Sequence, residues 1–366
     1  MSTPPADISR PRPFLRGLRA TTPIVLVAAI ALAALLLAAL QWFVGSGAFT
    51  AIPESAMLRI PNDDYVHSSY LLADLAKHPP QGPVVYIFGG SGAIEMMRDE
   101  ADLGRRVSRA AGEPVRVVRL ATHNQSPAQT LAMIDSLPPG RGLVAIGVST
   151  NRFTTTPGED ASLLGDGTLV VRDGALRRFL APYTDVGRRL PGGLAGVLGF
   201  AVSYVRQRAS LATPWLTPLT YRQHYIDSSY RPPMAKRVAG ARQELDREQP
   251  LYDRWALYDF AALAAAVKLA QQKGYRVALF EQPLAPEASG PGWNAFRARY
   301  QSDVAAHAAA LDVPYIASVQ TDAGLRASDF GDLFHLNPKG RAKWAWPFAE
   351  ALVRALQGRV SLPSSG

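Results

Sequence analysis

A serine within a glycine-rich turn is the first residue of this sequence whose position suggests chemistry. Ser91 lies in FGGSGAIE, directly after the apolar run PVVYIF. Near the other end of the chain, the segment DLFHLNPKG places Asp332 three residues before His335. A serine hydroxyl becomes a nucleophile when an imidazole takes its proton and a carboxylate orients that imidazole. We therefore interpret Ser91, His335 and Asp332 as a candidate catalytic triad.

The predicted secondary structure brings these residues to one place. Short apolar runs rich in β-branched residues predict five strands, at 83–88, 114–121, 142–148, 275–281 and 313–318. Helical patterns cover 64–79, 91–100, a segment from Ser126, 253–273, 292–310 and 338 to about 357. This alternation predicts an α/β fold with a parallel five-stranded sheet covered on both faces. The serine and the histidine then follow the first and fifth strands, at the carboxyl edge where such sheets place their sites.

The terminal block and the serine turn together resemble the SGNH or GDSL-like hydrolases, over about 83–150 and 275–357. The resemblance implies a flavodoxin-like three-layer α/β/α fold. It also implies that Ser91 is the nucleophile, His335 the general base and then acid, and Asp332 the orienting acid.

The oxyanion hole implied by this resemblance is less well matched. We expect the backbone N–H of Ser91, the side chain of Asn151 and a group near Asn124 to form it. The family's second block carries a glycine, whereas ATHNQSPAQ has none. Its third block has an aspartate where GVSTNRF has Arg152. A lost donor of this kind costs roughly 3 to 4 kcal/mol of barrier.

Two other classes of function remain open at this stage. The turn FGGSGAI is similar to the pyrophosphate-binding turn of nucleotide-sugar epimerases and short-chain reductases. Against that alternative, Glu95 replaces the glycine needed for close helix packing, and the chain has no Tyr-x-x-x-Lys pair. The other alternative is a degenerate SGNH domain that binds glycan or a membrane acyltransferase without turnover, which the altered middle blocks favour.

An uncharged apolar segment at 23–44 predicts a transmembrane helix. Four arginines precede it, so we expect 1–22 to be a cytoplasmic tail and the rest to be extracytoplasmic, on a bacterial-type cell membrane. The alternative is a cleaved signal peptide, with Ser46-Gly47-Ala48 as the cleavage site. We further expect a stalk at 45–63 and an SGNH-like domain at 64–366, with an insertion at about 152–250.

Composition limits the remaining possibilities. The chain of 366 residues has a net charge of +9, of which the tail, with four arginines and one aspartate, supplies +3. The absence of cysteine excludes disulfides and thiolate metal sites. We expect no metal, no cofactor and no nucleic-acid partner. The apolar run at 192–205 is too short to span a membrane, and we expect it to be buried locally or to rest on the bilayer.

Three lesser candidates complete the set. His123 follows the second predicted strand and either contacts substrate or is structural. Asp303 and His307, four residues apart on a helical pattern, are expected to form a solvated face.

The sequence thus predicts a membrane-anchored serine esterase or O-acyltransferase. It would act through an acyl-serine on acyl esters, most simply acetyl esters, of a cell-envelope glycan. Its resemblance to polysaccharide O-acetylation and teichoic-acid D-alanylation proteins implies a membrane-bound O-acyltransferase as partner.

Overall fold

A parallel sheet of five strands lies at the centre of this computed structural model, which describes residues 23–51, 64–97, 99–166, 174–184 and 234–359, with 198, 200–202, 205 and 209. The strands are β1 (Val84–Phe88), β2 (Arg116–Arg119), β3 (Gly142–Val148), β4 (Arg276–Glu281) and β5 (Tyr315–Ile316). Their order is β2-β1-β3-β4-β5, and every pair is parallel. The predicted α/β class and the five-stranded parallel sheet are therefore confirmed, in an order typical of doubly wound sheets.

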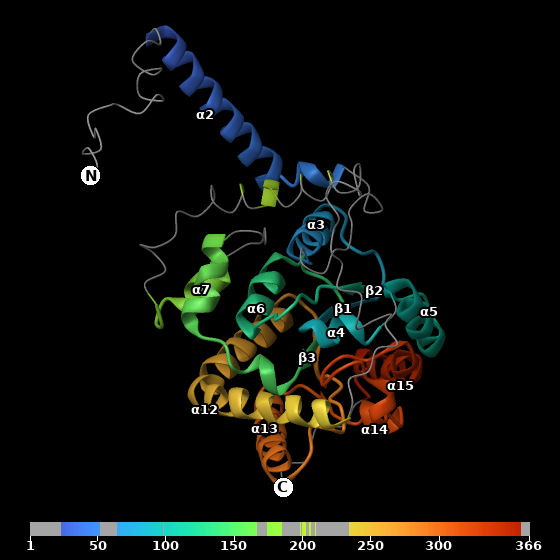
Figure 1. The fold of residues 1–366 in the computed structure, drawn as a ribbon. Coiled ribbons are helices and arrows are strands. Elements are labelled where there is room, and N and C mark those ends of the chain that lie inside the picture. Colours follow the sequence, from blue (N-terminus) through green and yellow to red (C-terminus); the bar gives the residue numbers. More distant parts are fainter. Residues whose placement is uncertain are drawn as a thin grey trace, which may run out of the picture.

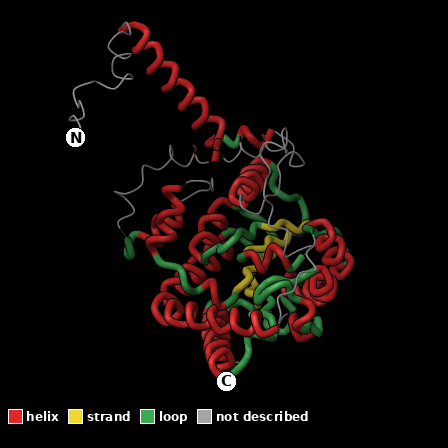
Figure 2. The backbone as a smooth tube through the Cα atoms, in the orientation of Figure 1, coloured by secondary structure: helices red, strands yellow, loops and turns green. Residues whose placement is uncertain are grey.

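Helices cover both faces of this sheet (Figures 1 and 2). Successive side chains of a strand point to opposite faces, so β1 contributes Val84, Tyr86 and Phe88 to one core and Val85 and Ile87 to the other. The first core is completed by α3 (Asp64–Lys77), α6 (Pro127–Ser136), α12 (Met234–Gln272) and α13 (Pro291–Ala310). The second is completed by α4 (Ser91–Glu95), α5 (Glu100–Ala111), α14 (Val319–Asp322) and α15 (Pro338–Leu356). Burial on both faces explains why the strands are continuous apolar runs.

Several predicted boundaries are wrong. The predicted helix at 91–100 is two helices, because α4 ends at Glu95 and Asp99 begins a new one. The Asp99 side chain accepts a hydrogen bond from the backbone N–H of Asp102 at 2.6 Å, which is an N-cap, and α5 then continues to Ala111. The second and fifth strands are shorter than predicted, since only four and two residues pair with their neighbours.

The region of the predicted insertion contributes to the helical layer. Here lie the helices α7 (Pro157–Asp166) and α8 (Gly174–Leu180), and α12 already begins at Met234 instead of at 253. Leu176 and Leu180 of α8 are buried against α6 and α12. The boundaries 152 and 250 stay a prediction, but the last part of that range is the first half of α12. Within the run 192–205, Phe200 is buried and Val205 exposed, while most of the remainder lies outside the described residues.

An isolated helix, α2 (Pro23–Gly45), projects from the body of the molecule (Figure 1). It is long and apolar enough to cross a membrane. A short 3₁₀ helix, η1 (Ala48–Ala51), follows it, and there Phe49 is fully buried beside Tyr70 of α3 and Phe200. Lys77 Nζ donates a hydrogen bond to the carbonyl of Gly47 at 2.7 Å. These contacts attach the end of α2 to the α/β domain. The predicted tail at 1–22 and most of the predicted stalk lie outside the described residues.

Candidate active site

Ser91 is the first residue of α4, in the turn that leaves the carboxyl end of β1. Gly89, which has φ +154°, begins this turn, and a Cβ there would lie 2.6 Å from the Cβ of Ala93. The backbone N–H of Gly89 donates to Gln125 Oε1 at 2.8 Å, which joins the turn to the loop after β2. A glycine is therefore required at position 89. The sharp turn that it allows places Ser91 at the edge of the sheet.

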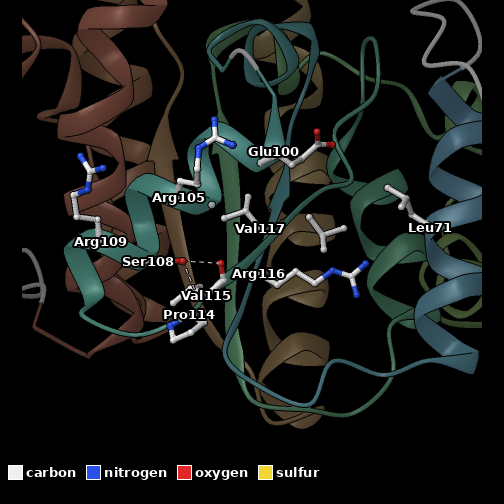
Figure 3. A pocket seen from close by; sticks show the side chains of 12 residues that line it. Leu71, Glu100, Arg105, Ser108, Arg109, Pro114, Val115, Arg116 and Val117 are labelled. Atoms are coloured by element: carbon white, nitrogen blue, oxygen red, sulfur yellow. Dashed lines mark hydrogen bonds between the residues drawn. The ribbon is translucent and has the colours of Figure 1, made fainter. Parts of the chain in front are cut away.

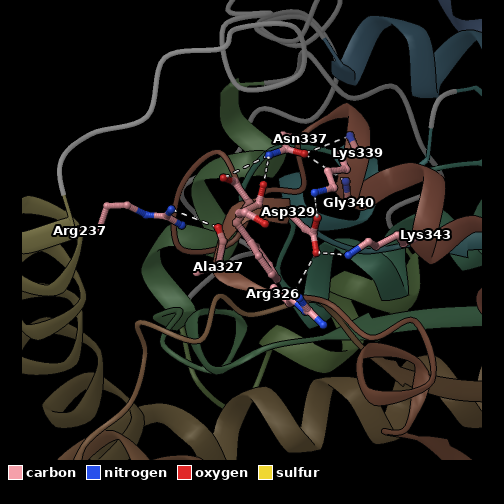
Figure 4. Close-up of polar contacts among 10 residues, drawn as sticks. Arg237, Arg326, Ala327, Asp329, Asn337, Lys339, Gly340 and Lys343 are labelled. Carbon is pink, nitrogen blue, oxygen red and sulfur yellow. Dashed lines mark hydrogen bonds and ion pairs between the residues drawn. The ribbon is translucent and has the colours of Figure 1, made fainter.

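His335 and Asp332 lie in the loop that precedes α15. Asn337 caps this helix, since its Oδ1 accepts hydrogen bonds from the backbone N–H groups of Lys339 and Gly340, both at 3.0 Å (Figure 4). The backbone N–H of Asn337 in turn donates to the carbonyl of Asp329 at 3.0 Å. Asn337 therefore fixes the loop at the start of α15, and this restrains the side chains of His335 and Asp332.

The three candidate residues form a continuous chain of hydrogen bonds. His335 Nε2 lies 2.8 Å from Ser91 Oγ, and His335 Nδ1 lies 2.8 Å from both carboxylate oxygens of Asp332. Asp332 Oδ1 also accepts from the backbone N–H groups of Phe334 and His335, each at 2.9 Å. Residues 244 positions apart in sequence thus meet, with the imidazole between the hydroxyl and the carboxylate.

The electrostatics of this chain follow from its hydrogen bonds. Burial alone would lower the pKa of His335, but its hydrogen bond to Asp332 and the charges of Asp332 and Glu95 outweigh burial and raise it. Burial alone would raise the pKa of Asp332, but the hydrogen bond and charge of His335 outweigh it and lower that pKa. The aspartate therefore stays ionised while the imidazole takes up a proton more readily than usual.

Glu95 is a second carboxyl group near the imidazole, and no local sequence pattern signals its role here. It lies four residues after Ser91 on α4 and is only 5% exposed. Its Oε2 has no hydrogen-bond partner among the described residues. Burial raises the pKa of Glu95 to about 7. Its charge state therefore changes near neutral pH, within the field of His335.

A small cavity of about 30 Å³ lies beside the serine and is lined by both predicted asparagines, Asn124 and Asn151. Asn151 Oδ1 accepts a hydrogen bond from Ser149 Oγ at 2.7 Å, which leaves the amide nitrogen as the free donor end of that side chain. Asn124 has φ +50° in the loop after β2. No described residue accepts a hydrogen bond from the backbone N–H of Ser91. The structure thus brings together the three groups expected to form an oxyanion hole.

The Arg152 side chain is buried and held by hydrogen bonds to the protein around it. Its buried guanidinium donates to the carbonyl of Gln125 at 2.7 Å, to Thr130 Oγ1 at 3.1 Å and to the carbonyl of Gly147. Burial lowers the pKa of Arg152 to about 10. The side chain therefore joins the loop after β2 to the end of β3, the two segments that carry the cavity's asparagines.

The expectation for His123 stays a prediction, whereas packing decides the expectation for Asp303 and His307. His123 is half-buried and does not line the described cavity beside Ser91. The expectation of a solvated face at Asp303 and His307 is wrong, because both are packed against α12. Asp303 accepts from the Tyr252 hydroxyl at 2.8 Å, and the His307 ring stacks on Phe260 with 4.0 Å between the ring centroids. Asp303 and His307 therefore join α13 to α12.

A larger hollow, of about 710 Å³, lies along β2 and α5 (Figure 3). Its hydroxyl group belongs to Ser108, which donates to the carbonyl of Val115 at 3.2 Å and accepts from the N–H of the same residue at 2.9 Å. The hollow is also lined by three arginines, Arg105, Arg109 and Arg116. No histidine lines this hollow among the described residues, so it lacks a base for that serine. The smaller cavity beside Ser91 is therefore the candidate active site.

Comparison with models of known protein families gives no match, and comparison with curated proteins gives none either. Within the described part of the chain, no group of three or more histidine and acidic side chains is arranged to hold a metal ion.

Proposed function

We propose that this protein is a membrane-anchored serine esterase or O-acyltransferase of the SGNH type, acting on acetyl esters of an extracytoplasmic glycan. The observation that carries the proposal is the hydrogen-bonded series Ser91, His335 and Asp332 at the carboxyl edge of the sheet. A serine, an imidazole and an ionised carboxylate in this order perform acyl transfer on many unrelated folds.

The geometry supports a two-step reaction. Ser91 Oγ attacks the acyl carbonyl carbon while His335 Nε2 takes the hydroxyl proton, and the carbonyl oxygen becomes an oxyanion. When the C–O bond of the ester breaks, His335 returns that proton to the departing sugar oxygen, which leaves as a hydroxyl, and an acyl-serine remains. Water, or a second sugar hydroxyl, then attacks with His335 again as base, which releases acetate or an acetylated sugar and restores Ser91.

The size of the cavity supports a small acyl group. The cavity beside Ser91 is small, at about 30 Å³. An acetyl group therefore suits it better than a long acyl chain. Asn151 and the N–H of Ser91 are the donors we assign to the oxyanion, and preorganised donors of this kind supply much of the rate in acyl transfer.

The orientation predicted for the chain supports a glycan of the cell envelope as substrate. The described α2 can cross a bilayer, and the arginines before it favour an extracytoplasmic domain. We propose a membrane-bound O-acyltransferase as the partner, because it would deliver acyl groups at the same surface.

The test of this function uses the full-length chain in detergent. We expect a fluorophosphonate probe to label wild type at Ser91, and p-nitrophenyl acetate to be hydrolysed. Ser91→Ala and His335→Ala should abolish both signals, whereas Ser108→Ala, which alters the serine of the larger hollow, should retain them. A folded wild-type protein that neither labels nor hydrolyses the ester would contradict the proposal and favour a binding domain.

A second measurement separates transfer from hydrolysis. Oligosaccharides are added as acceptors, and the products are examined by mass spectrometry. A gain of one acetyl group on the sugar that depends on Ser91 indicates a transferase. Release of acetate without acetylated sugar indicates an esterase, since water then resolves the acyl-serine.

A further inference from the structure

The amide of Gln282 is a buried polar group next to Ser91 that the proposed mechanism leaves unused. Gln282 directly follows β4, and its backbone N–H donates to the carbonyl of Val148 at 2.9 Å. The residue is 4% exposed. Its side-chain Nε2 is buried and has no hydrogen-bond partner among the described residues. Leaving such a group unpaired destabilises the folded protein, so its retention needs a reason.

The surroundings of this amide place it over the serine turn. A Cβ added to Gly92 would lie 2.6 Å from Gln282 Oε1, and a Cβ added to Gly89 would lie 3.5 Å from Nε2. Gln282 lines the same 30 Å³ cavity as Ser91 and Asn151. The glycine after the serine is thus explained, because any side chain at position 92 would displace the amide.

Gln125 provides a contrast within the same site. It is also buried after a strand, but its Oε1 accepts from the N–H of Gly89 and its Nε2 donates to the carbonyl of Leu120, both at 2.8 Å. This amide is used within the protein and holds two loops together. Gln282 is also a buried amide, but its Nε2 donor is unpaired. An unpaired buried donor is the arrangement expected of a group that binds substrate.

We infer that Gln282 is a further catalytic residue, whose amide N–H donates a hydrogen bond to the acyl oxygen of the substrate in the cavity beside Ser91. The inference rests on the proposed acyl-transfer function. With the Ser91 N–H and Asn151, Gln282 would complete a set of three donors for the oxyanion. It would also compensate for the absence of glycine from the loop that carries Asn124.

The test compares Gln282→Met with Gln125→Met in the full-length protein. Methionine keeps an unbranched side chain of similar length and removes the amide. For Gln282→Met we expect kcat on p-nitrophenyl acetate to fall about 10²-fold, with little change in KM, and the melting temperature to stay equal or rise. For Gln125→Met the melting temperature should fall, because two buried backbone groups lose their partners.

A second variant checks the contact itself. Gly92→Ala should lower kcat strongly in wild type and much less in the Gln282→Met background, since the displaced amide is already absent there. Gln282→Met with wild-type kcat, or with a melting temperature that falls as in Gln125→Met, would overturn the inference while leaving the triad standing. A wild-type protein that neither labels nor turns over would overturn the proposed function, and the inference with it.

Discussion

Glu95 shows how a single buried carboxyl group couples stability to pH at this site. In the unfolded chain its pKa is near the ordinary value of 4.5, whereas burial raises it to about 7 in the folded protein. The folded state therefore binds more protons between these values, and this group lowers stability as pH rises from 4.5 to 7. Above pH 7 the full cost of an ionised, buried carboxylate is present.

We predict that Glu95→Gln stabilises the protein at pH 8 but has little effect at pH 4.5. The gain at pH 8 is at most roughly 3 kcal/mol, from about 1.4 kcal/mol for each pKa unit. Thermal denaturation of both proteins at the two pH values measures the difference. The exposed Glu113→Gln is the control and should stay within about 0.5 kcal/mol at both. An equal effect of Glu95→Gln at both pH values would contradict the prediction.

The pair His335 and Asp332 makes a second prediction at this scale. In the proposed mechanism His335 must be neutral to accept a proton, so kcat/KM should decline as pH falls through the raised pKa of His335. In Asp332→Asn the imidazole loses the hydrogen bond and charge that raise this pKa, so the acidic limb should move to lower pH. The plateau should also drop by about 10⁴-fold, because an amide fixes the wrong tautomer. An unmoved limb in the pH–rate profile would show that another group governs it.

The role of a residue can be predicted from sequence when it depends on neighbours in the chain, and not when it depends on contacts with distant segments. The candidate triad could be predicted because a serine turn and an Asp-x-x-His block are local patterns with distinct chemistry. Gln282 could not, since its significance depends on its contact with Gly92, in a distant part of the chain. Arg152 likewise looked like a lost aspartate in sequence, and only its hydrogen bonds to the loop after β2 and to the end of β3 give it a role.

At the scale of elements, the N-cap of α15 links helix stability to the proposed catalysis. Asn337 closes the first turn of that helix and also donates through Nδ2 to the carbonyl of Ser328 at 2.9 Å. Because His335 lies two residues before the cap, loosening the cap should also loosen the proposed base. The Asp329–Lys343 ion pair at 2.7 Å spans the same loop and helix (Figure 4).

We predict that Asn337→Ala lowers stability by about 1 kcal/mol or more and also lowers kcat. The matched control is Asp99→Ala, which removes the N-cap of α5 and should lower stability by a similar amount with kcat unchanged. Thermal denaturation and steady-state kinetics on the same samples separate the two effects. If both variants lost the same share of kcat, the activity loss would reflect general destabilisation.

The limits of predicting elements have physical causes. The strands were found because burial on both faces makes them continuous apolar runs between turn residues. The start of α12 at Met234 was missed because Pro250 is a helix breaker in most contexts, yet here the helix continues through it. The short β5 was overestimated because an edge strand of two residues carries the same apolar signal as a longer one.

For the whole molecule, the central question is how α2 and the α/β domain are placed relative to a membrane. The last turns of α2 lead into η1, where Phe49 and the Lys77–Gly47 contact join the helix to the domain without a long described linker. A helix that crosses a bilayer would therefore hold the domain close to the surface. Four arginines before α2 favour the extracytoplasmic surface.

We predict the following labelling pattern for single-cysteine variants, which are specific because the natural chain has no cysteine. The Leu257→Cys variant reports on the α/β domain, because Leu257 is 83% exposed on α12. The Ser9→Cys variant reports on the tail before α2. In spheroplasts a membrane-impermeant maleimide should label the first variant directly and the second only after lysis. The reverse pattern would place the domain in the cytoplasm and remove the envelope glycan as substrate. If the tail cysteine were absent from the mature protein even after lysis, the helix would be a cleaved signal peptide, and the domain would be released from its anchor with its triad intact.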